Sequence, residues 1–117
     1  MPKDTPEQLA AKQAAIQDAL VGATEVPLDI MRTAAACVEH ADFLARSGSR
    51  MARSDAGVSV AFARAAVDGA SLNVYINAAS IDDAERAARY RDEADRLVAQ
   101  TREHCDEVFA FVKDAVS

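Results

Sequence analysis

The chain has 117 residues and half of them are apolar, which is enough for one domain with a modest hydrophobic core. Its formal net charge is −6 and no basic stripe interrupts it, which argues against nucleic-acid binding. Charged residues break every apolar stretch well short of the roughly 20 residues that a membrane span needs, and no signal-peptide pattern opens the chain, so we expect a soluble, cytoplasmic protein with no membrane partner.

Alanine is the commonest residue, tryptophan is absent, and the chain has only four glycines and three prolines. This composition favours closely packed helices over sheets. The two cysteines, Cys37 and Cys105, fall inside helical patterns, whereas a small secreted domain would carry a denser set of disulfides, so we expect reduced thiols. Cys37 and His40 are three positions apart, but no third and fourth ligand follow at zinc-site spacing, so we expect no metal site.

The first predicted helix begins with Thr5, a proline and Gln8, the spacing of a capping box. Steps of four and three then predict its inner stripe: Leu9, Gln13, Ile16, Leu20, Ala23, Pro27, Ile30, Ala34, Cys37, Ala41 and Leu44. The stripe keeps its phase through Pro27, which predicts one long helix kinked at the proline rather than a turn. We expect Gly48 to end this helix in a left-handed conformation, within a loop over residues 47–54.

The second predicted helix runs from a cap at Ser54 or Asp55 to about Ala79. It carries few charges beyond its first turn, so we expect it to be the central and mostly buried helix. Its small residues, Gly69 among them, would let neighbouring backbones approach closely. A glycine costs about 1 kcal/mol in a helix, which suggests a packing reason for Gly69.

The third predicted helix starts at a capping box formed by Ser80 and Asp83 and runs nearly to the C-terminus. Its inner stripe consists of Ala87, Tyr90, Ala94, Leu97, Thr101, His104, Val108 and Phe111. Steps of three and four imply packing at shallow angles. The predicted fold class is therefore all-α: a bundle of long, near-antiparallel helices with a proline-kinked first helix and a buried central helix.

The predicted helices differ in length, and the first would span about 60 Å at 1.5 Å per residue. Apolar stripes on the longer helices would then extend past the central helix. We expect a homodimer, or a missing segment of the same domain, to cover them.

Four polar residues of the second predicted helix fall near one face: Asp55, Ser59, Asn73 and Asn77. Small residues lie between them, so this face could line a polar pocket. Alternatively, the two asparagines hydrogen-bond across a helix interface while Asp55 only caps the helix. No Gly-rich phosphate loop, nucleophile elbow or paired-histidine motif accompanies them, so we expect no nucleophilic catalysis.

Three arginines, Arg46, Arg50 and Arg53, lie in and beside the predicted loop of an otherwise acidic chain. Such a cluster could capture the anionic tail of a ligand. The alternative is a solvated loop with ion pairs of its own, such as one between Arg53 and Asp55. Position along the chain does not decide between the two.

Three ordered blocks of sequence resemble a known family: Ala23-Thr24-Glu25-Val26-Pro27-Leu28, Ser54-Asp55-Ala56-Gly57-Val58, and Gly69-Ala70-Ser71-Leu72-Asn73-Val74-Tyr75-Ile76-Asn77. Through them nearly the whole chain resembles the formimidoyltetrahydrofolate cyclodeaminases and methenyltetrahydrofolate cyclohydrolases. Members of that family begin with further helices and a glycine-rich segment that this chain lacks. Residues 1–117 therefore look like a single helical unit, the C-terminal part of such a domain. One departure lies at Gly48-Ser49, where many relatives have Gly-Asn.

The resemblance implies folate-dependent one-carbon metabolism, with a tetrahydrofolate derivative as substrate and no tightly bound cofactor. In the cyclohydrolase reaction, water adds to the electrophilic one-carbon bridge of 5,10-methenyltetrahydrofolate and the ring opens to 10-formyltetrahydrofolate. Cyclodeaminases instead close the ring of formimidoyltetrahydrofolate with loss of ammonia. We favour the cyclohydrolase reaction because no formiminotransferase domain is attached.

In either reaction the resemblance implies that Asp55 is the catalytic acid/base or polarising group. The implied substrate-binding residues are Arg50, Arg53, Ser54, Asn73 and Asn77. The arginines would attract the glutamate tail, and the asparagines would line the pterin pocket. The alternative, from a different class of protein, is a catalytically inert helical dimerisation fragment that keeps the family's interface without a complete site.

Overall fold

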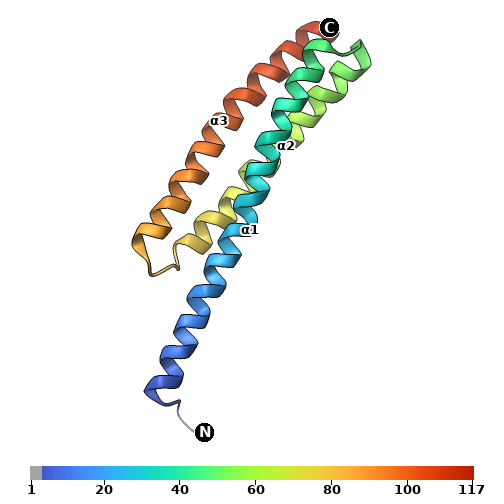
Figure 1. The fold of residues 1–117 in the computed structure, drawn as a ribbon. Coiled ribbons are helices and arrows are strands. Elements are labelled where there is room, and N and C mark those ends of the chain that lie inside the picture. The colour runs from blue at the N-terminus through green and yellow to red at the C-terminus, as the bar shows by residue number, and fades with distance from the viewer. Residues whose placement is uncertain (1–3) are drawn as a thin grey trace.

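Three helices make up the computed structural model, which describes residues 4–117 (Figure 1). They are α1 (Pro6–Ser47), α2 (Arg50–Ala78) and α3 (Ala84–Val116). α2 runs back along the C-terminal half of α1, and α3 runs beside α2, so consecutive helices are near-antiparallel (Figure 1). The first turns of α1 extend beyond the turn between α2 and α3, which gives an elongated molecule of 69 × 25 × 17 Å. The predicted all-α bundle is confirmed.

The start of α1 has the predicted capping box. The Thr5 hydroxyl accepts a hydrogen bond from the Gln8 amide at 3.2 Å, and the Gln8 side-chain oxygen accepts one from the Thr5 amide at 2.8 Å. Two amides without a partner inside the helix are thereby satisfied, which stabilises the first turn. α1 then continues unbroken through Pro27, so the prediction of one long helix is confirmed.

The turn between α1 and α2 is much shorter than predicted. Only Gly48 and Ser49 separate the helices, and the Ser49 hydroxyl caps α2 by accepting a hydrogen bond from the amide three positions on, at 3.3 Å. The predicted loop over residues 47–54 and the predicted cap at Ser54 or Asp55 are therefore wrong. The serine directly after the glycine already supplies the cap, and the Arg-Met-Ala-Arg run that follows favours helix.

Gly48 does not adopt the left-handed conformation expected of it, since its φ is −83° and its ψ is 171°. Its lack of a side chain matters for a different reason. A Cβ atom would lie 2.6 Å from the Leu44 carbonyl oxygen, which accepts a hydrogen bond from the Gly48 amide at 2.8 Å. The extended conformation leads directly into the cap of α2, so Asp55 lies inside that helix, in its second turn.

The turn between α2 and α3 also differs from its prediction. Asp83 alone caps α3, because its carboxylate accepts a hydrogen bond from the Arg86 amide at 3.1 Å. The predicted capping box between Ser80 and Asp83 is wrong. Ser80 belongs to the turn, where its amide donates to the Asn77 carbonyl at 3.1 Å. An aspartate at this position satisfies the first turn without a second partner.

The core lies along the seam where the three helices meet, in two clusters of buried side chains. One cluster contains Leu28 of α1 and Val67 of α2, and the other contains Val38 of α1 and Val108 of α3. All four side chains have at most 1% of their surface exposed. The predicted inner stripe of α3 is confirmed, since each of its residues is buried or half-buried.

α1 buries a different stripe from the predicted one. Its buried residues are Thr24, Pro27, Leu28, Met31, Val38, Ala41 and Ala45. Of the predicted stripe only Pro27 and Ala41 are buried, and seven members are exposed: Leu9, Gln13, Ile16, Ala23, Ile30, Cys37 and Leu44. The two stripes adjoin, and the many alanines of α1 make their hydropathy too similar to separate from the sequence.

α2 makes the most extensive contacts with the other two helices, as predicted for the central helix, but the prediction that it is mostly buried is wrong, because only one of its faces is buried. At Gly57 it approaches α3 so closely that a Cβ atom would lie 2.8 Å from Val112 Cγ1. Its opposite face is exposed and apolar, with exposed fractions of 80% for Met51, 73% for Phe62 and 69% for Ile76. α2 therefore has one face in the core and one apolar face exposed to water.

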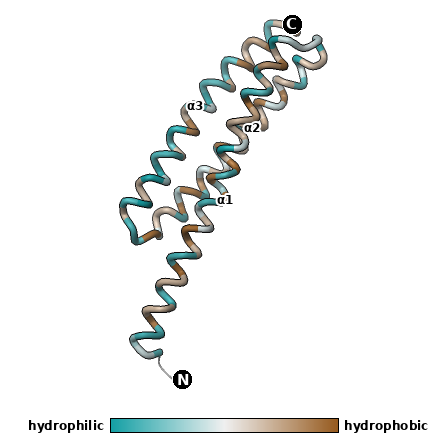
Figure 2. Tube along the Cα trace, in the orientation of Figure 1, coloured by the Kyte–Doolittle hydropathy of each residue, from teal (hydrophilic) through white to brown (hydrophobic). Residues whose placement is uncertain are grey.

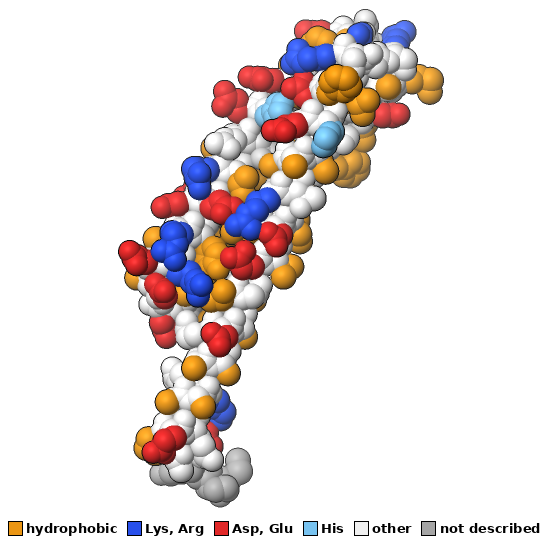
Figure 3. Space-filling view, viewed as in Figure 1, with side chains coloured by type: hydrophobic (Ala, Val, Ile, Leu, Met, Phe, Trp, Pro, Cys, Tyr) orange, Lys and Arg blue, Asp and Glu red, His pale blue; other side chains and the backbone are white. Residues whose placement is uncertain are grey.

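The three helices differ in hydropathy (Figure 2). α3 is largely hydrophilic, whereas hydrophobic residues recur along α1 and α2. In the space-filling view, acidic and basic side chains cover much of the visible face, and hydrophobic side chains gather along its right edge (Figure 3). No helix within residues 4–117 is long and apolar enough to cross a membrane.

Candidate functional site

An open groove of about 450 Å³ lies between α1 and α2 and holds Asp55, the residue predicted to be catalytic. Both helices line it: Cys37, His40, Ala41, Leu44, Ala52, Asp55, Ala56 and Ser59. Asp55 is exposed, and none of the ion pairs within residues 4–117 includes it. Its carboxylate is therefore accessible to a molecule bound in the groove.

Ser59 lines this groove with Asp55, as expected of two residues on one face of the helix, and Cys37 and His40 of α1 join them, which was not predicted. α1 sets Cys37 and His40 on one face because they are three positions apart, and α2 does the same for Asp55 and Ser59, four apart. A carboxylate, an imidazole and a hydroxyl can exchange protons with a bound molecule and orient it. Within the described part of the chain, no group of three or more His, Cys, Asp or Glu side chains could hold a metal ion.

Arg50 and Arg53 lie at the end of the bundle where α2 begins. Arg50 Nη2 donates to the Val116 carbonyl of α3 at 2.7 Å, and Arg53 Nη2 donates to the Arg46 carbonyl of α1 at 3.4 Å. These bonds satisfy carbonyls near the C-terminal ends of both helices. The ion pair between Arg53 and Asp55 does not form. Arg53 Nε is buried and has no hydrogen-bond partner among residues 4–117.

The other predicted binding residues lie away from the groove of Asp55. Ser54 lines a separate groove between α2 and α3. Asn73 is exposed on the same face of α2 as Asp55, but roughly five helical turns further on, which is about 27 Å at 1.5 Å per residue. A single protomer therefore does not bring Asp55 and Asn73 into one pocket.

Asn77 has a partner inside the chain. Its side-chain amide donates to the Ala23 carbonyl of α1 at 2.8 Å. In a helix that carbonyl accepts from the amide four residues on, but the residue there is Pro27, which has no N–H. Asn77 thus replaces the hydrogen bond that the proline removes, and the alternative of an asparagine bonded across a helix interface is confirmed for this residue. Two of the three sequence blocks meet at this contact.

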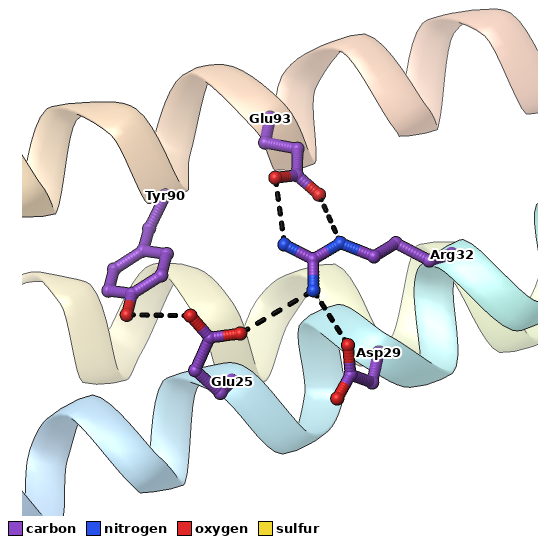
Figure 4. Close-up of polar contacts among 5 residues, drawn as sticks. All are labelled: Glu25, Asp29, Arg32, Tyr90 and Glu93. Atoms are coloured by element: carbon purple, nitrogen blue, oxygen red, sulfur yellow. Dashed lines mark hydrogen bonds and ion pairs between the residues drawn. The ribbon is translucent and has the colours of Figure 1, made fainter.

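A polar network around Arg32 joins α1 to α3 (Figure 4). The guanidinium donates to the two carboxylate oxygens of Glu93 at 2.5 and 2.8 Å, and to Asp29 at 2.6 Å. Glu25 lies 3.5 Å from the same guanidinium and accepts from the Tyr90 hydroxyl at 2.9 Å. The bond from Arg32 holds the pKa of Glu93 below its usual range, whereas burial and the bond to Glu25 raise the pKa of Tyr90. Each charged group here has a partner within the chain, so the network links helices.

A second polar link between α1 and α3 lies further along both helices. His104 Nε2 lies 2.8 Å from one Asp42 carboxylate oxygen, and Arg46 Nε donates to the other at 2.6 Å. The hydrogen bond with His104, followed by that from Arg46, lowers the pKa of Asp42. Arg46 also lies over the Phe111 ring, 4.7 Å from its centroid. Arg46 is thus engaged within the chain rather than free to capture an anion.

Comparison with known proteins gives concordant matches. The sequence model of the family described as formiminotransferase-cyclodeaminase matches residues 1–96. A methenyltetrahydrofolate cyclohydrolase of Methylorubrum extorquens is 38% identical over 117 residues, all of this chain and 56% of that protein. The formimidoyltransferase-cyclodeaminase of Sus scrofa is 33% identical over 102 residues, 87% of this chain and 19% of that protein. That of Gallus gallus is 30% identical over 112 residues, 96% of this chain and 20% of that protein. The chain thus spans about half of the first relative and about a fifth of the other two.

Proposed function

Since the chain belongs to the formiminotransferase-cyclodeaminase family, we propose that it works in folate one-carbon metabolism and contributes to hydrolysis of 5,10-methenyltetrahydrofolate. The match of the whole chain to a methenyltetrahydrofolate cyclohydrolase supports this reaction over the related cyclodeaminase reaction on formimidoyltetrahydrofolate. The folate is a substrate in this proposal, and no tightly bound cofactor is needed. A cytoplasmic location is part of the same proposal.

The groove at Asp55 is the observation that carries the proposal. In the reaction, a water oxygen bonds to the cationic carbon that bridges two nitrogens, and the water gives up a proton. One carbon–nitrogen bond then breaks as the new hydroxyl group loses its proton and becomes the formyl carbonyl, and the leaving nitrogen takes a proton, so that one proton is released overall. An accessible carboxylate such as that of Asp55 stabilises the positive charge on the bridging carbon and can accept the proton from water. An imidazole such as that of His40 can donate a proton to the leaving nitrogen. Both groups line the groove from different helices.

The arginines have a second role in this proposal, which is to attract the glutamate tail of the folate. Arg50 and Arg53 are close to the groove in sequence, and Arg53 keeps a buried Nε with no partner among the described residues. An anion that reached this nitrogen would satisfy it with a charge-assisted hydrogen bond. The bonds that both arginines make to helix-end carbonyls set their positions before a ligand arrives.

A catalytically inert dimerisation fragment is the competing proposal, and one observation favours it. Asp55 and Asn73 are about 27 Å apart in a single protomer, so one copy of the chain does not assemble all the predicted binding residues. An incomplete site would bind a partner but would not turn over the substrate.

A spectroscopic assay of methenyltetrahydrofolate ring opening separates the two proposals. The enzyme proposal expects a rate above that of buffer that rises with protein concentration. If a sample shown to be helical by circular dichroism adds no rate to that of buffer at high protein concentration, the enzyme proposal is contradicted and the inert fragment remains.

A further inference from the structure

Ser59 follows Asp55 by one turn of α2, and both side chains line the groove between α1 and α2. The two residues are four positions apart, which places their Cβ atoms about 5–6 Å from each other on one face of the helix. Both are exposed. The proposed function uses the Asp55 carboxylate as the acceptor of a proton from water, and it leaves the hydroxyl beside that carboxylate without a role.

The Ser59 hydroxyl differs from three other hydroxyls in the helices. Those of Thr24, Ser47 and Ser71 each donate to a carbonyl three or four residues earlier, at 2.7, 2.6 and 2.6 Å respectively. Such a bond satisfies the hydroxyl within its own helix. The Ser59 side chain makes no hydrogen bond to any residue between 4 and 117, so its hydroxyl is open to a molecule in the groove.

The rest of the α2 wall of the groove is apolar. Its other lining residues are Ala52 and Ala56, whose side chains neither donate nor accept hydrogen bonds. The carbonyls of a helix interior are already bonded within the helix. On this wall, a water molecule therefore finds its hydrogen-bond acceptors in Asp55 and Ser59.

We propose that Ser59 is a second catalytic residue of the ring-opening reaction, and that it orients the attacking water together with Asp55. A water molecule held between the two side chains donates one hydrogen to the Asp55 carboxylate and the other to Ser59 Oγ. Two hydrogen bonds of about 2.8 Å from one oxygen join acceptors roughly 4–5 Å apart, a separation that suits residues one helical turn apart. The water oxygen then directs a lone pair toward the bridging carbon of a folate in the groove.

The proton transfers follow those of the proposed function, on which this inference rests. As the water oxygen bonds to the cationic carbon, one of its protons passes to Asp55. The other proton stays on the new hydroxyl group, which remains hydrogen-bonded to Ser59 Oγ. It leaves to solvent when the carbon–nitrogen bond breaks and the formyl carbonyl forms. Ser59 neither gains nor loses a proton, so it needs no base of its own.

Steady-state kinetics of methenyltetrahydrofolate ring opening tests this role. Ser59→Ala removes the acceptor and should lower kcat by roughly tenfold with KM unchanged, because the hydrogen bond orients water and does not hold the folate. Ser59→Thr keeps a hydroxyl and should recover most of that loss. An unchanged kcat of Ser59→Ala, or a raised KM with an unchanged kcat, would overturn the proposed role.

Ser47→Ala is the matched control. Ser47 is also an exposed serine, but its hydroxyl donates to the Phe43 carbonyl of its own helix and it does not line the groove of Asp55. This variant should open the ring as fast as the wild type does. An equal loss of kcat in Ser47→Ala and Ser59→Ala would show that the loss does not come from the groove, and would overturn the role of Ser59.

A double-mutant cycle shows whether the two residues act on one water molecule. Without the Asp55 carboxylate the water is no longer held by its first hydrogen, so the second acceptor has little left to orient. The double variant of Asp55→Asn and Ser59→Ala should therefore be slower than Asp55→Asn alone by no more than about twofold. A further loss of a full tenfold would show independent roles and contradict the shared water.

The same kinetics separates failure of this inference from failure of the proposed function. If the wild type is active and Ser59→Ala is equally fast, the proposed function stands and Ser59 has no part in it. If the wild type is inactive, the proposed function is contradicted and the role of Ser59 with it. Circular dichroism should show all variants equally helical, because the exposed Ser59 hydroxyl bonds to nothing within residues 4–117.

Discussion

Two faces of the molecule are in contact with water but differ in the kind of side chain that they carry. The first is the face where α1 meets α3. The second is the exposed stripe along α2, which we call the outer stripe: Met51, Asp55, Val58, Phe62, Ala65, Gly69, Leu72 and Ile76. On the first, Arg32 is bonded to three carboxylates and Asp42 is bonded to both His104 and Arg46. On the second, Asp55 is the only charge along seven turns of helix. Paired charges stabilise a solvated surface, whereas an uncharged stripe with one carboxylate suits a partner or ligand. The paired charges of the first face maintain the fold, whereas the second face is available to a partner or a ligand.

The largest effect should come from the carboxylate of the outer stripe. Asp55→Asn removes the charge but keeps the size of the side chain, so turnover in the active protein should fall by roughly 10²-fold or more. Because Asp55 is not a helix cap, its loss should change the free energy of unfolding by less than about 0.5 kcal/mol. Unchanged turnover would remove Asp55 from the chemistry. Glu93→Gln, on the other face, is the control and should leave turnover unchanged.

The two glycines of α2, buried Gly57 and exposed Gly69, should respond to alanine with opposite signs. Gly57→Ala forces a Cβ atom to within 2.8 Å of a buried valine methyl, so it should destabilise the protomer by about 1 kcal/mol even after the gain in helix propensity. Gly69→Ala meets nothing inside the chain and should stabilise the monomer by about 0.5–1 kcal/mol. Urea unfolding at low protein concentration measures both. Destabilisation of the monomer by Gly69→Ala would mean that the outer stripe is not free.

The bond between Asn77 and Ala23 predicts a specific coupling. Asn77→Ala should cost about 1 kcal/mol, because the Ala23 carbonyl loses its donor. In a Pro27→Ala background the restored backbone amide supplies that donor, so the same Asn77→Ala change should cost much less. A double-mutant cycle of unfolding free energies gives the comparison. Equal costs in both backgrounds would show that Asn77 does not act through this carbonyl.

The smallest effect should come from the network on the α1–α3 face. The pKa of Glu93 is lowered in the folded state, so its contribution is present at neutral pH and is lost as the pH falls through that pKa. Glu93→Gln should therefore destabilise by less than about 1 kcal/mol at pH 7, since the Arg32 side chain is 41% exposed. The difference from wild type should shrink once the pH falls below the ordinary carboxyl pKa and should vanish below the lowered pKa of Glu93. A constant difference across that range would exclude the charge as its cause.

The sequence predicted what depends on local periodicity and capping. The capping box at Thr5, the passage of α1 through Pro27 and the inner stripe of α3 all follow from spacing within one helix. The prediction from sequence was wrong where two neighbouring residues were about equally suited to the same role. Ser49 and Ser54 are both suitable N-caps, and Ser49 is the one that caps α2. Asp55 therefore lies on a face of the helix rather than at its end.

The candidate site was predicted in part for the same reason. Asp55 was identified through a sequence block, but His40 was not connected to it, because the connection depends on how α1 and α2 align across a two-residue turn. The pairing of Arg32 with Glu93 likewise needs the register of two helices. The hydrogen-bond partner of Asn77 could have been predicted from the sequence, because a proline in a helix leaves the carbonyl four residues earlier without its N–H donor.

Turnover of the wild type, Asp55→Asn and Glu93→Gln, measured side by side, shows whether the exposed face of α2 carries the chemistry and the α1–α3 face only the fold. Ring opening of methenyltetrahydrofolate should fall by roughly 10²-fold or more in Asp55→Asn and stay unchanged in Glu93→Gln, with all three proteins equally helical. Equal turnover of Asp55→Asn and the wild type, or no turnover by the wild type, would contradict the assignment.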